Sequence, residues 1–241
     1  MMKIILPVII IIAVGILLWN KVFTPVSNKV ISTPQTTQVK NQVIKESSPS
    51  GKYTLDIEYP QVGNAADLEI TKIVDGIKDN FLAEVKTSQP IPDLKDALAS
   101  LTVRYDVCRS DDKFVSTPFN IEDYQVGMAH PDNFVEAFNF DLSNNKVLQL
   151  SDIFTKNADY LNLLSKLTSE KLTNQYKDDP NASDFIKSGT APKQENFQNF
   201  CLTKDDLVII FNPALVAPYV DGIQKVSIPW KDLGDTLSQK F

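Results

Sequence analysis

Apolar side chains follow three patterns along this chain, and each pattern predicts a different kind of element. The first is an almost unbroken apolar run over residues 4–19, preceded by Lys3. With Val22 and Phe23 the run reaches about 20 residues, the length that spans the apolar core of a bilayer. It lacks the small-residue site of a cleaved signal peptide. We therefore expect an uncleaved transmembrane signal anchor at residues 1–23, with cleavage as the alternative.

The second pattern covers residues 24–50, where Thr, Ser, Gln, Asn and Pro dominate and apolar residues occur singly. Such a segment buries too little apolar surface to fold by itself, so it predicts a flexible linker. The few residues before the apolar run cannot form a domain. The folded part is therefore expected on the extracytoplasmic side of the cell membrane, attached by a single-pass helix.

The third pattern, in residues 51–241, alternates strand and helix periods. Alternation at 53–59 and 101–107 predicts strands, and apolar residues at helical spacing predict a helix at about 65–85. The turn at 143–146 predicts a hairpin. A second helix at about 158–176, a polar excursion at 178–192, strands near 197–202, 207–211 and 224–228, and a short last helix follow. This order predicts an α+β fold, an antiparallel sheet packed against helices. We expect one composite domain with halves at 51–110 and 111–241.

Charge narrows the range of partners. The whole chain has a net charge of −6, and its residues 51–241 hold 19 basic and 29 acidic residues, a net charge of −10. An acidic surface repels phosphate backbones, so no nucleic acid is expected as a partner. A cationic partner or a cation fits this surface better, although many acidic domains are simply soluble.

The two cysteines, Cys108 and Cys201, lie in an oxidising compartment if the topology is right, so a disulfide is allowed. Alternation places each of them on the less apolar face of its strand. This parity is compatible with a bridge but does not bring the two thiols together, so two separate structural cysteines remain the alternative.

Few residues suggest catalysis or metal binding. His130 is the single histidine, and it lies in a tight loop between strands, where histidines more often cap a turn. The oxygen-rich segment 178–184 lacks the central Gly and late Glu of a calcium loop. Nucleotide-binding glycine motifs are absent. We therefore assign no catalytic residue, no metal ligand and no cofactor.

Several segments in the second half occur in an order typical of a known extracytoplasmic module. They are residues 127–131, 139–142, 148–154, 196–200, 207–211, 216–222 and 226–230. Together they resemble the domain of unknown function that forms the C-terminal ectodomain of the anti-sigma factor RsiV and also occurs in the peptidoglycan deacetylase PdaC. Ala214 departs from the family, which commonly has an aromatic residue there. The resemblance implies a composite α+β fold, a role in the cell envelope and, as in RsiV, recognition of lysozyme.

These observations together favour a membrane-anchored binding module for a lysozyme or a peptidoglycan component. The loops that contain His130 and Asp132, and Tyr219 and Asp221, are the candidate binding residues, with the alternative that the second loop only shapes a turn. A cell-envelope hydrolase or carbohydrate-processing enzyme is the second hypothesis, and it predicts convergent carboxylates near His130. An assembly subunit is the third, and it predicts a large exposed apolar patch.

Overall fold

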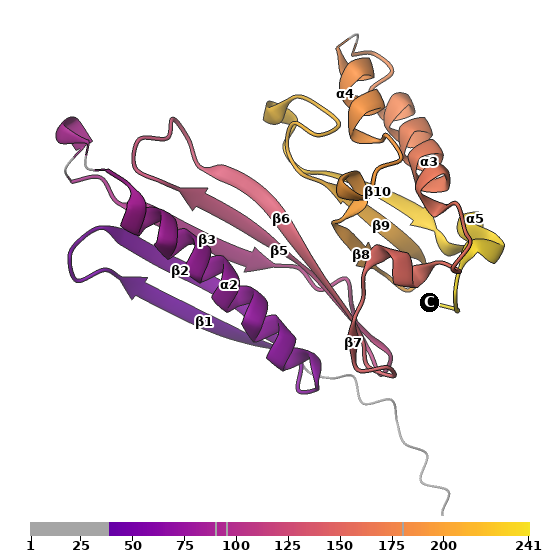
Figure 1. Ribbon diagram of the computed structural model, residues 1–241, viewed down its shortest axis with the longest axis horizontal. Coiled ribbons are helices and arrows are strands. Elements are labelled where there is room, and N and C mark those ends of the chain that lie inside the picture. The colour runs from indigo at the N-terminus through magenta and orange to yellow at the C-terminus, as the bar shows by residue number, and fades with distance from the viewer. Residues whose placement is uncertain (1–38, 90, 95, 180) are drawn as a thin grey trace, which may run out of the picture. The chain divides into compact units, whose positions relative to one another are not determined.

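The structure, a computed structural model, describes residues 39–241 except 90, 95 and 180. The predicted anchor at residues 1–23 and the first part of the predicted linker lie outside these residues. In the part of the chain that is described, no helix combines the length and the apolar character needed to cross a bilayer. The described residues form two sheets covered by helices, so the chain is α+β as predicted (Figure 1).

The larger sheet has seven strands and is mixed rather than antiparallel. Its strands are β1 (Lys40–Ser47), β2 (Tyr53–Gln61), β3 (Ala99–Tyr105), β4 (Arg109–Ser110), β5 (Phe114–Tyr124), β6 (Asp132–Asp141) and β7 (Lys146–Val147), in the order β1-β2-β3-β5-β6-β7 with β4 on β5. β2 and β3 are parallel, with Ile57 opposite Val103. This corrects the predicted antiparallel sheet. A helix between β2 and β3 returns the chain to the end where β2 began, so both strands run the same way.

That helix, α2 (Ala66–Thr87), closes the first core against the sheet. Its buried positions recur every three or four residues, as predicted, and are Ala66, Ile70, Val74, Ile77, Phe81 and Val85. The start of the helix is held by side chains: Asn64 Oδ1 accepts from the N–H of Ala66 at 2.9 Å, and Asp67 accepts from the N–H of Val62 at 2.7 Å. These acceptors satisfy amides that have no partner within the helix or strand.

Strand β1 replaces the last part of the predicted linker. Its residues pair with β2 along their whole length, from Lys40 opposite Gln61 to Ser47 opposite Thr54. The sequence predicted a linker because a polar segment cannot fold alone, but a neighbouring strand supplies the backbone partners that the segment lacks. β1 is an edge strand of its sheet, and its lysines oppose pairing with a further strand.

The smaller sheet is antiparallel, in the order β10-β9-β8, and belongs to the C-terminal part of the chain. Its strands are β8 (Phe200–Leu202), β9 (Asp206–Phe211) and β10 (Gln224–Pro229), and its helices are α3 (Tyr160–Gln175), α4 (Ala182–Gly189) and α5 (Trp230–Leu233). Short 3₁₀ helices are η1 (Pro92–Leu94), η2 (Leu150–Ile153), η3 (Gln194–Phe197), η4 (Tyr219–Asp221) and η5 (Gly234–Thr236). α4 corrects the predicted excursion at 178–192, because Ala182 and Ile186, four residues apart, bury one side of an otherwise polar segment.

Side-chain amides join the two sheets along β6. The backbone N–H groups of Val135 and Ala137 donate to Asn212 Oδ1 at 2.8 Å and to Asn199 Oδ1 at 3.1 Å. The buried amide of Asn139 donates to the carbonyl of Phe200 in β8 at 2.8 Å. These bonds satisfy a strand edge that would otherwise leave donors unpaired. The larger sheet itself holds strands from both sides of residue 110, where the sequence suggested a boundary between halves, because β3 pairs with β5.

Cys108 and Cys201, which the sequence left either bridged or separate, are joined by a disulfide. The bridge links the connection between β3 and β4 to β8, across a sequence separation of 93 residues. Beside it, Ser116 Oγ accepts from the N–H of Leu202 at 2.8 Å and donates to Asn139 at 2.6 Å. A covalent bond and a buried polar network therefore hold the two sheets together.

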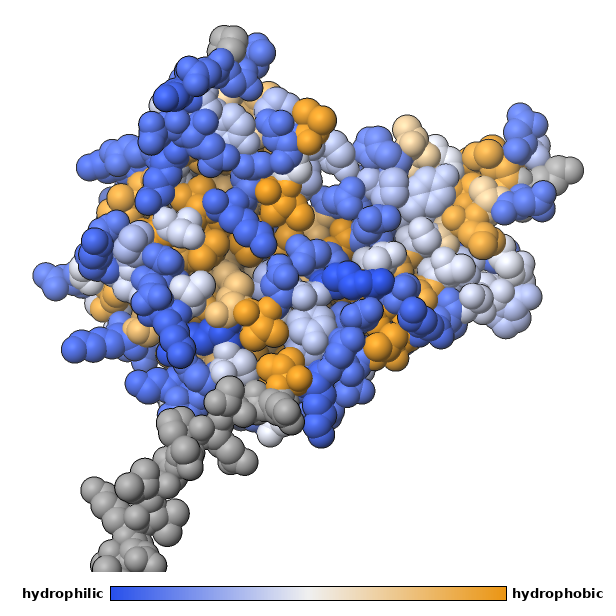
Figure 2. Space-filling model, turned by 180° about the vertical axis from the view of Figure 1, so that it is seen from behind, coloured by the Kyte–Doolittle hydropathy of each residue, from blue (hydrophilic) through white to orange (hydrophobic). Residues whose placement is uncertain are grey.

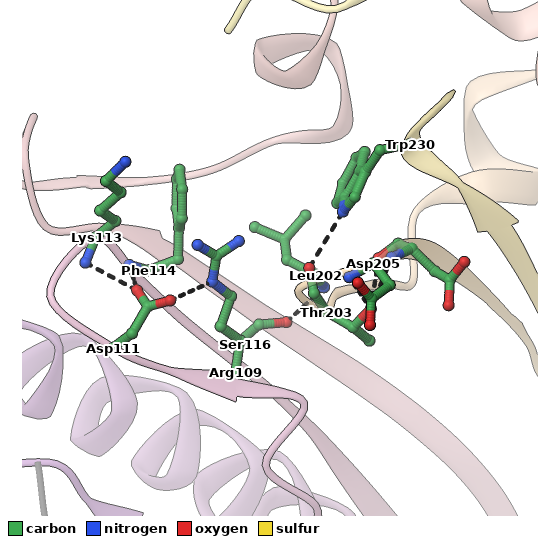
Figure 3. Close-up of polar contacts among 10 residues, drawn as sticks. Arg109, Asp111, Lys113, Phe114, Ser116, Leu202, Thr203, Asp205 and Trp230 are labelled. Atoms are coloured by element: carbon green, nitrogen blue, oxygen red, sulfur yellow. Dashed lines mark hydrogen bonds and ion pairs between the residues drawn. The ribbon is translucent and has the colours of Figure 1, made fainter. Parts of the chain in front are cut away.

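A buried charge lies next to this junction (Figure 3). Arg109 donates from Nε to Asp111 Oδ2 at 2.6 Å, and its guanidinium lies 4.6 Å from the centre of the Phe114 ring. Asp111 also accepts from the N–H groups of Lys113 and Phe114, both at 2.9 Å. Burial by itself raises the pKa of Asp111, but these hydrogen bonds and the charge of Arg109 outweigh it, so the pKa lies below its ordinary value.

We expect Asp111→Asn to lower the free energy of unfolding at neutral pH by about 2 kcal/mol, because a buried guanidinium loses its charged partner. A lowered folded-state pKa stabilises the protein above the unfolded pKa of about 3.9, and this stabilisation is lost as pH falls through the folded value. Urea unfolding at neutral pH and in acid should therefore show a difference between wild type and variant that shrinks in acid. Asp112→Asn, at the exposed neighbouring position, is the control; equal losses in the two variants would contradict the prediction.

Candidate functional site

The connection between β5 and β6, residues 125–131, is a tight turn that delivers His130 to the surface. Gly127 has a φ of +102°, and a Cβ at this position would lie 2.6 Å from Cδ1 of Ile91. Glycine therefore answers two needs here, a left-handed backbone and a close approach. The N–H of Met128 donates to the carbonyl of Gln125 at 3.0 Å and closes the turn. The turn packs against the connection between α2 and β3.

His130 contacts Tyr219, which the sequence places in a different loop. The two rings lie with their centres 5.0 Å apart at an angle of 38°. Tyr219 Oη donates to the carbonyl of Pro131 at 3.2 Å, across 88 residues of sequence. Nδ1 of His130 lies 2.9 Å from the same carbonyl and donates to it in the tautomer that carries the proton there. The two loops that the sequence indicated as candidate binding loops therefore contact each other and form one surface.

Helix η4 presents Tyr219 and its neighbour on this surface. Pro218 precedes it, and Gly222 ends it with a φ of +68°. A proline with fixed φ and a glycine in the left-handed region together enforce a compact turn. At the centre of this turn Val220 is 89% exposed, and Tyr219 is 39% exposed. The turn thus holds apolar area in water, which a bound partner would cover.

A second group of exposed apolar side chains lies in the connection that Gly127 contacts through Ile91. It consists of Ile91, Leu94 and Leu98 in the connection between α2 and β3, each about two-fifths exposed. Figure 2 shows apolar surface gathered at this end, on the right of the view. Contiguous exposed apolar area is typical of interaction surfaces.

An acidic residue lies two positions after each of the contacting residues, Asp132 after His130 and Asp221 after Tyr219. Asp132 lies opposite Asp123 in the pairing of β5 with β6, and Asp221 ends η4. The carboxylates of Asp132 and Asp221 form no hydrogen bond or ion pair with other described residues. Burial, together with the nearby charges of Glu84 and Asp132, raises the pKa of Asp123 against the opposing effect of the Gln125 amide. We call His130, Asp132, Tyr219, Val220 and Asp221 the loop surface.

The geometry of the loop surface suits contact with a partner more than proton transfer. The partners of His130 are a tyrosine ring and a backbone carbonyl. No carboxylate or hydroxyl among the described residues forms the hydrogen bond to His130 that a general base needs. The described residues also contain no group of three His, Cys, Asp or Glu side chains placed to hold a metal ion.

Sequence reasoning missed two members of this region, Val220 and Asp123. Val220 lies in the predicted loop of Tyr219 and Asp221, but the sequence did not single it out, and the turn leaves it exposed. Asp123 lies at the end of a strand among other acids, and the tertiary structure buries it and brings the charges of Glu84 in α2 and Asp132 in β6 near it. The signal present in the sequence was a valine between Tyr219 and Asp221, in a segment that Pro218 and Gly222 mark as a turn.

Comparison with known proteins supports the family assignment. Residues 151–231 match the family described as "Protein of unknown function (DUF3298)". Over 141 residues, 58% of this chain, the sequence is 33% identical to the peptidoglycan-N-acetylmuramic acid deacetylase PdaC of Bacillus subtilis. The match covers 30% of that protein, so this chain spans under a third of its length.

Two crystal structures share the fold. A DUF3298 family member from Bacteroides fragilis superimposes with a TM-score of 0.61 at 19% identity, covering 86% of this chain and 96% of that chain. One from Pseudomonas aeruginosa PAO1 gives a TM-score of 0.64 at 14% identity, covering 85% of this chain and 97% of that chain. Residues 151–231, which supply helix η4 of the loop surface and the C-terminal sheet, thus match the DUF3298 family, and the chain shares the fold of these two family members.

Proposed function

We propose that this protein is a membrane-anchored binding module that recognises an extracytoplasmic partner through the loop surface. The observation that carries the proposal is the contact between His130 and Tyr219, which joins two loops distant in sequence into one surface that includes the exposed Val220. Rigid, exposed aromatic and apolar groups ringed by charges are the features of a protein recognition site.

Charge favours a basic partner. The carboxylates of Asp132 and Asp221 are free to pair with ammonium or guanidinium groups, and the chain as a whole is acidic. Complementary charge speeds encounter and selects against wrong partners. Lysozyme, which the resemblance to the RsiV ectodomain implies, is such a basic protein, and a peptidoglycan component is the second partner class. The apolar run at residues 4–19 and the disulfide both suit a chain exported through the membrane.

The test uses the full chain in detergent micelles with immobilised lysozyme and, separately, insoluble peptidoglycan. We expect lysozyme to bind and Val220→Asp to weaken binding by about 10-fold or more, since the substitution places a charge where apolar area is covered. Higher salt should also weaken binding, because exposed charges are screened. Surface plasmon resonance on immobilised lysozyme gives the affinities of the wild type and of Val220→Asp.

The matched control is Leu68→Asp, which makes the same change at an exposed apolar position of α2 (64% exposed). It should leave affinity unchanged. Equal weakening by Leu68→Asp and Val220→Asp, or no capture of the chain by either lysozyme or peptidoglycan at low salt, would overturn the assignment of the loop surface. Capture by peptidoglycan alone would move the proposal to the second partner class.

A further inference from the structure

A hollow in the protein surface, separate from the loop surface, lies beside the smaller sheet. It has a volume of about 790 Å³ and is lined by the turn between β8 and β9, at Lys204 and Asp205, and by the segment that follows β10, from Trp230 to Phe241. We propose that this hollow, the C-terminal pocket, binds an anionic saccharide. The proposal does not depend on the loop surface, and although its ligand class overlaps the second partner class, a peptidoglycan component, the variants given below separate the two sites.

One wall of the C-terminal pocket is aromatic and already in place. The rings of Trp230 and Phe241 are stacked with their centres 4.9 Å apart and their planes at 19°. Phe241 packs in turn on Phe114, centres 5.4 Å apart, and Phe114 carries the guanidinium of Arg109 on its ring. This stack continues the buried pair of Arg109 and Asp111 out to the pocket. A wall supported in this way loses little conformational freedom when a ligand binds.

Backbone contacts fix the orientation of the tryptophan (Figure 3). Trp230 Nε1 donates to the carbonyl of Thr203 at 3.2 Å, and its backbone N–H donates to the carbonyl of Asp205 at 3.1 Å. The indole is half-buried, so part of it remains open to the pocket. The ring therefore offers a stationary apolar face beside polar groups, the usual make-up of a small-molecule site.

The C-terminal pocket is richer in lysine than the acidic chain as a whole. Lys204, Lys231 and Lys240 line it, against Asp205 and Asp235, in a chain whose net charge is −6. All three lysines are exposed, and none forms an ion pair with another described residue. Unpaired ammonium groups around a hollow attract carboxylate or phosphate.

An acidic sugar satisfies all of these features together. The C–H face of a pyranose ring is apolar and packs flat on an aromatic ring, as other apolar rings do. Its hydroxyl groups donate to carboxylates such as Asp205 and Asp235, and its carboxylate or phosphate pairs with the lysines. A neutral sugar would leave the lysines without a partner, and a simple anion would leave the aromatic wall uncovered.

The chain supplies its own reporter for a binding experiment. It has two tryptophans, Trp19 and Trp230, so in a Trp19→Phe background the indole fluorescence comes from the pocket alone. The full chain in micelles is titrated at millimolar concentrations with N-acetylmuramic acid, N-acetylglucosamine 6-phosphate and neutral N-acetylglucosamine. We expect saturable changes with one or both acidic sugars and affinity about 10-fold weaker for the neutral one. Comparing the two acidic sugars shows whether carboxylate or phosphate is preferred.

Variants separate this site from the loop surface. Replacing Lys204, Lys231 and Lys240 together by Gln should lower affinity for the acidic sugars by about 10-fold while leaving the neutral sugar unchanged. Lys171→Gln on α3 is the exposed control, and Val220→Asp should have no effect on sugar binding. Equal affinity for acidic and neutral sugars, saturable binding that survives the triple replacement, or no binding of any sugar would overturn the proposal.

Discussion

Removal of the disulfide by Cys108→Ala with Cys201→Ala is expected to lower the free energy of unfolding by about 4–5 kcal/mol. The bridge closes a loop with a sequence separation of 93 residues, and a cross-link of that length removes much of the freedom of the unfolded chain. It also fixes the junction at which Ser116 and Asn139 connect the two sheets. Urea unfolding of the full chain in micelles measures the loss.

Reductant provides the matched comparison. Wild type in a reducing buffer should lose about the same stability as the double variant, and the double variant should not respond to the reductant at all. Because His130 and Tyr219 come from opposite sides of this junction, reduction should also weaken capture of the partner at the loop surface. A wild type whose unfolding is unchanged by reductant would contradict the prediction.

Gly189→Ala is expected to lower the free energy of unfolding by about 3 kcal/mol, the upper part of the range for overpacking. Gly189 is buried at the end of α4, where the backbone of the segment before η4 crosses the helix. A Cβ at this position would overlap the carbonyl of Leu215 and lie 2.7 Å from Cγ1 of Val216. The obstacle is mostly backbone, so the clash cannot be relieved by a change of rotamer.

Gly76→Ala is the matched control, because Gly76 lies in the exposed interior of α2 with open space around its Cα. Alanine has the higher helix propensity, so this variant should gain about 0.5–1 kcal/mol. Thermal unfolding followed by circular dichroism compares the two. A small loss at Gly189, or a loss of the same size at Gly76, would show that the packing of α4 on residues 215–216 is looser than described.

Local pattern predicted those elements whose conformation depends on their own residues. The apolar spacing of residues 66–85 gives α2 wherever the helix packs, and the turn at 143–146 needs only a residue such as Asn145, which has a φ of +49°. Three other features of the fold depend on residues far along the chain. β1 needs β2, the parallel pairing of β2 with β3 needs the crossover by α2, and α4 needs the surface provided by Val216.

The candidate sites divide in the same way. Residue type and turn chemistry indicated the loops of His130 and Tyr219, since Gly, Pro and polar residues between strands predict exposed turns whatever the fold. Their contact is a result of sheet packing, because the chain between them forms most of the second core before it returns to Pro131. The aromatic and lysine residues of the C-terminal pocket likewise form no recognisable motif in the sequence. They come together only because the turn between β8 and β9 lies next to the last segment of the chain.

By itself, the sequence determined the α+β class, the long helix over the first core, the turn chemistry of both recognition loops, the acidic charge and the apolar run at its start. These properties follow from side-chain spacing and backbone preference, which act over a few residues. Only the tertiary structure decided whether the two cysteines meet, which loops meet, which strands run parallel, and which valine and lysines are exposed. Those properties depend on pairings between distant residues, and the register and direction of such pairings are fixed by packing rather than by local pattern.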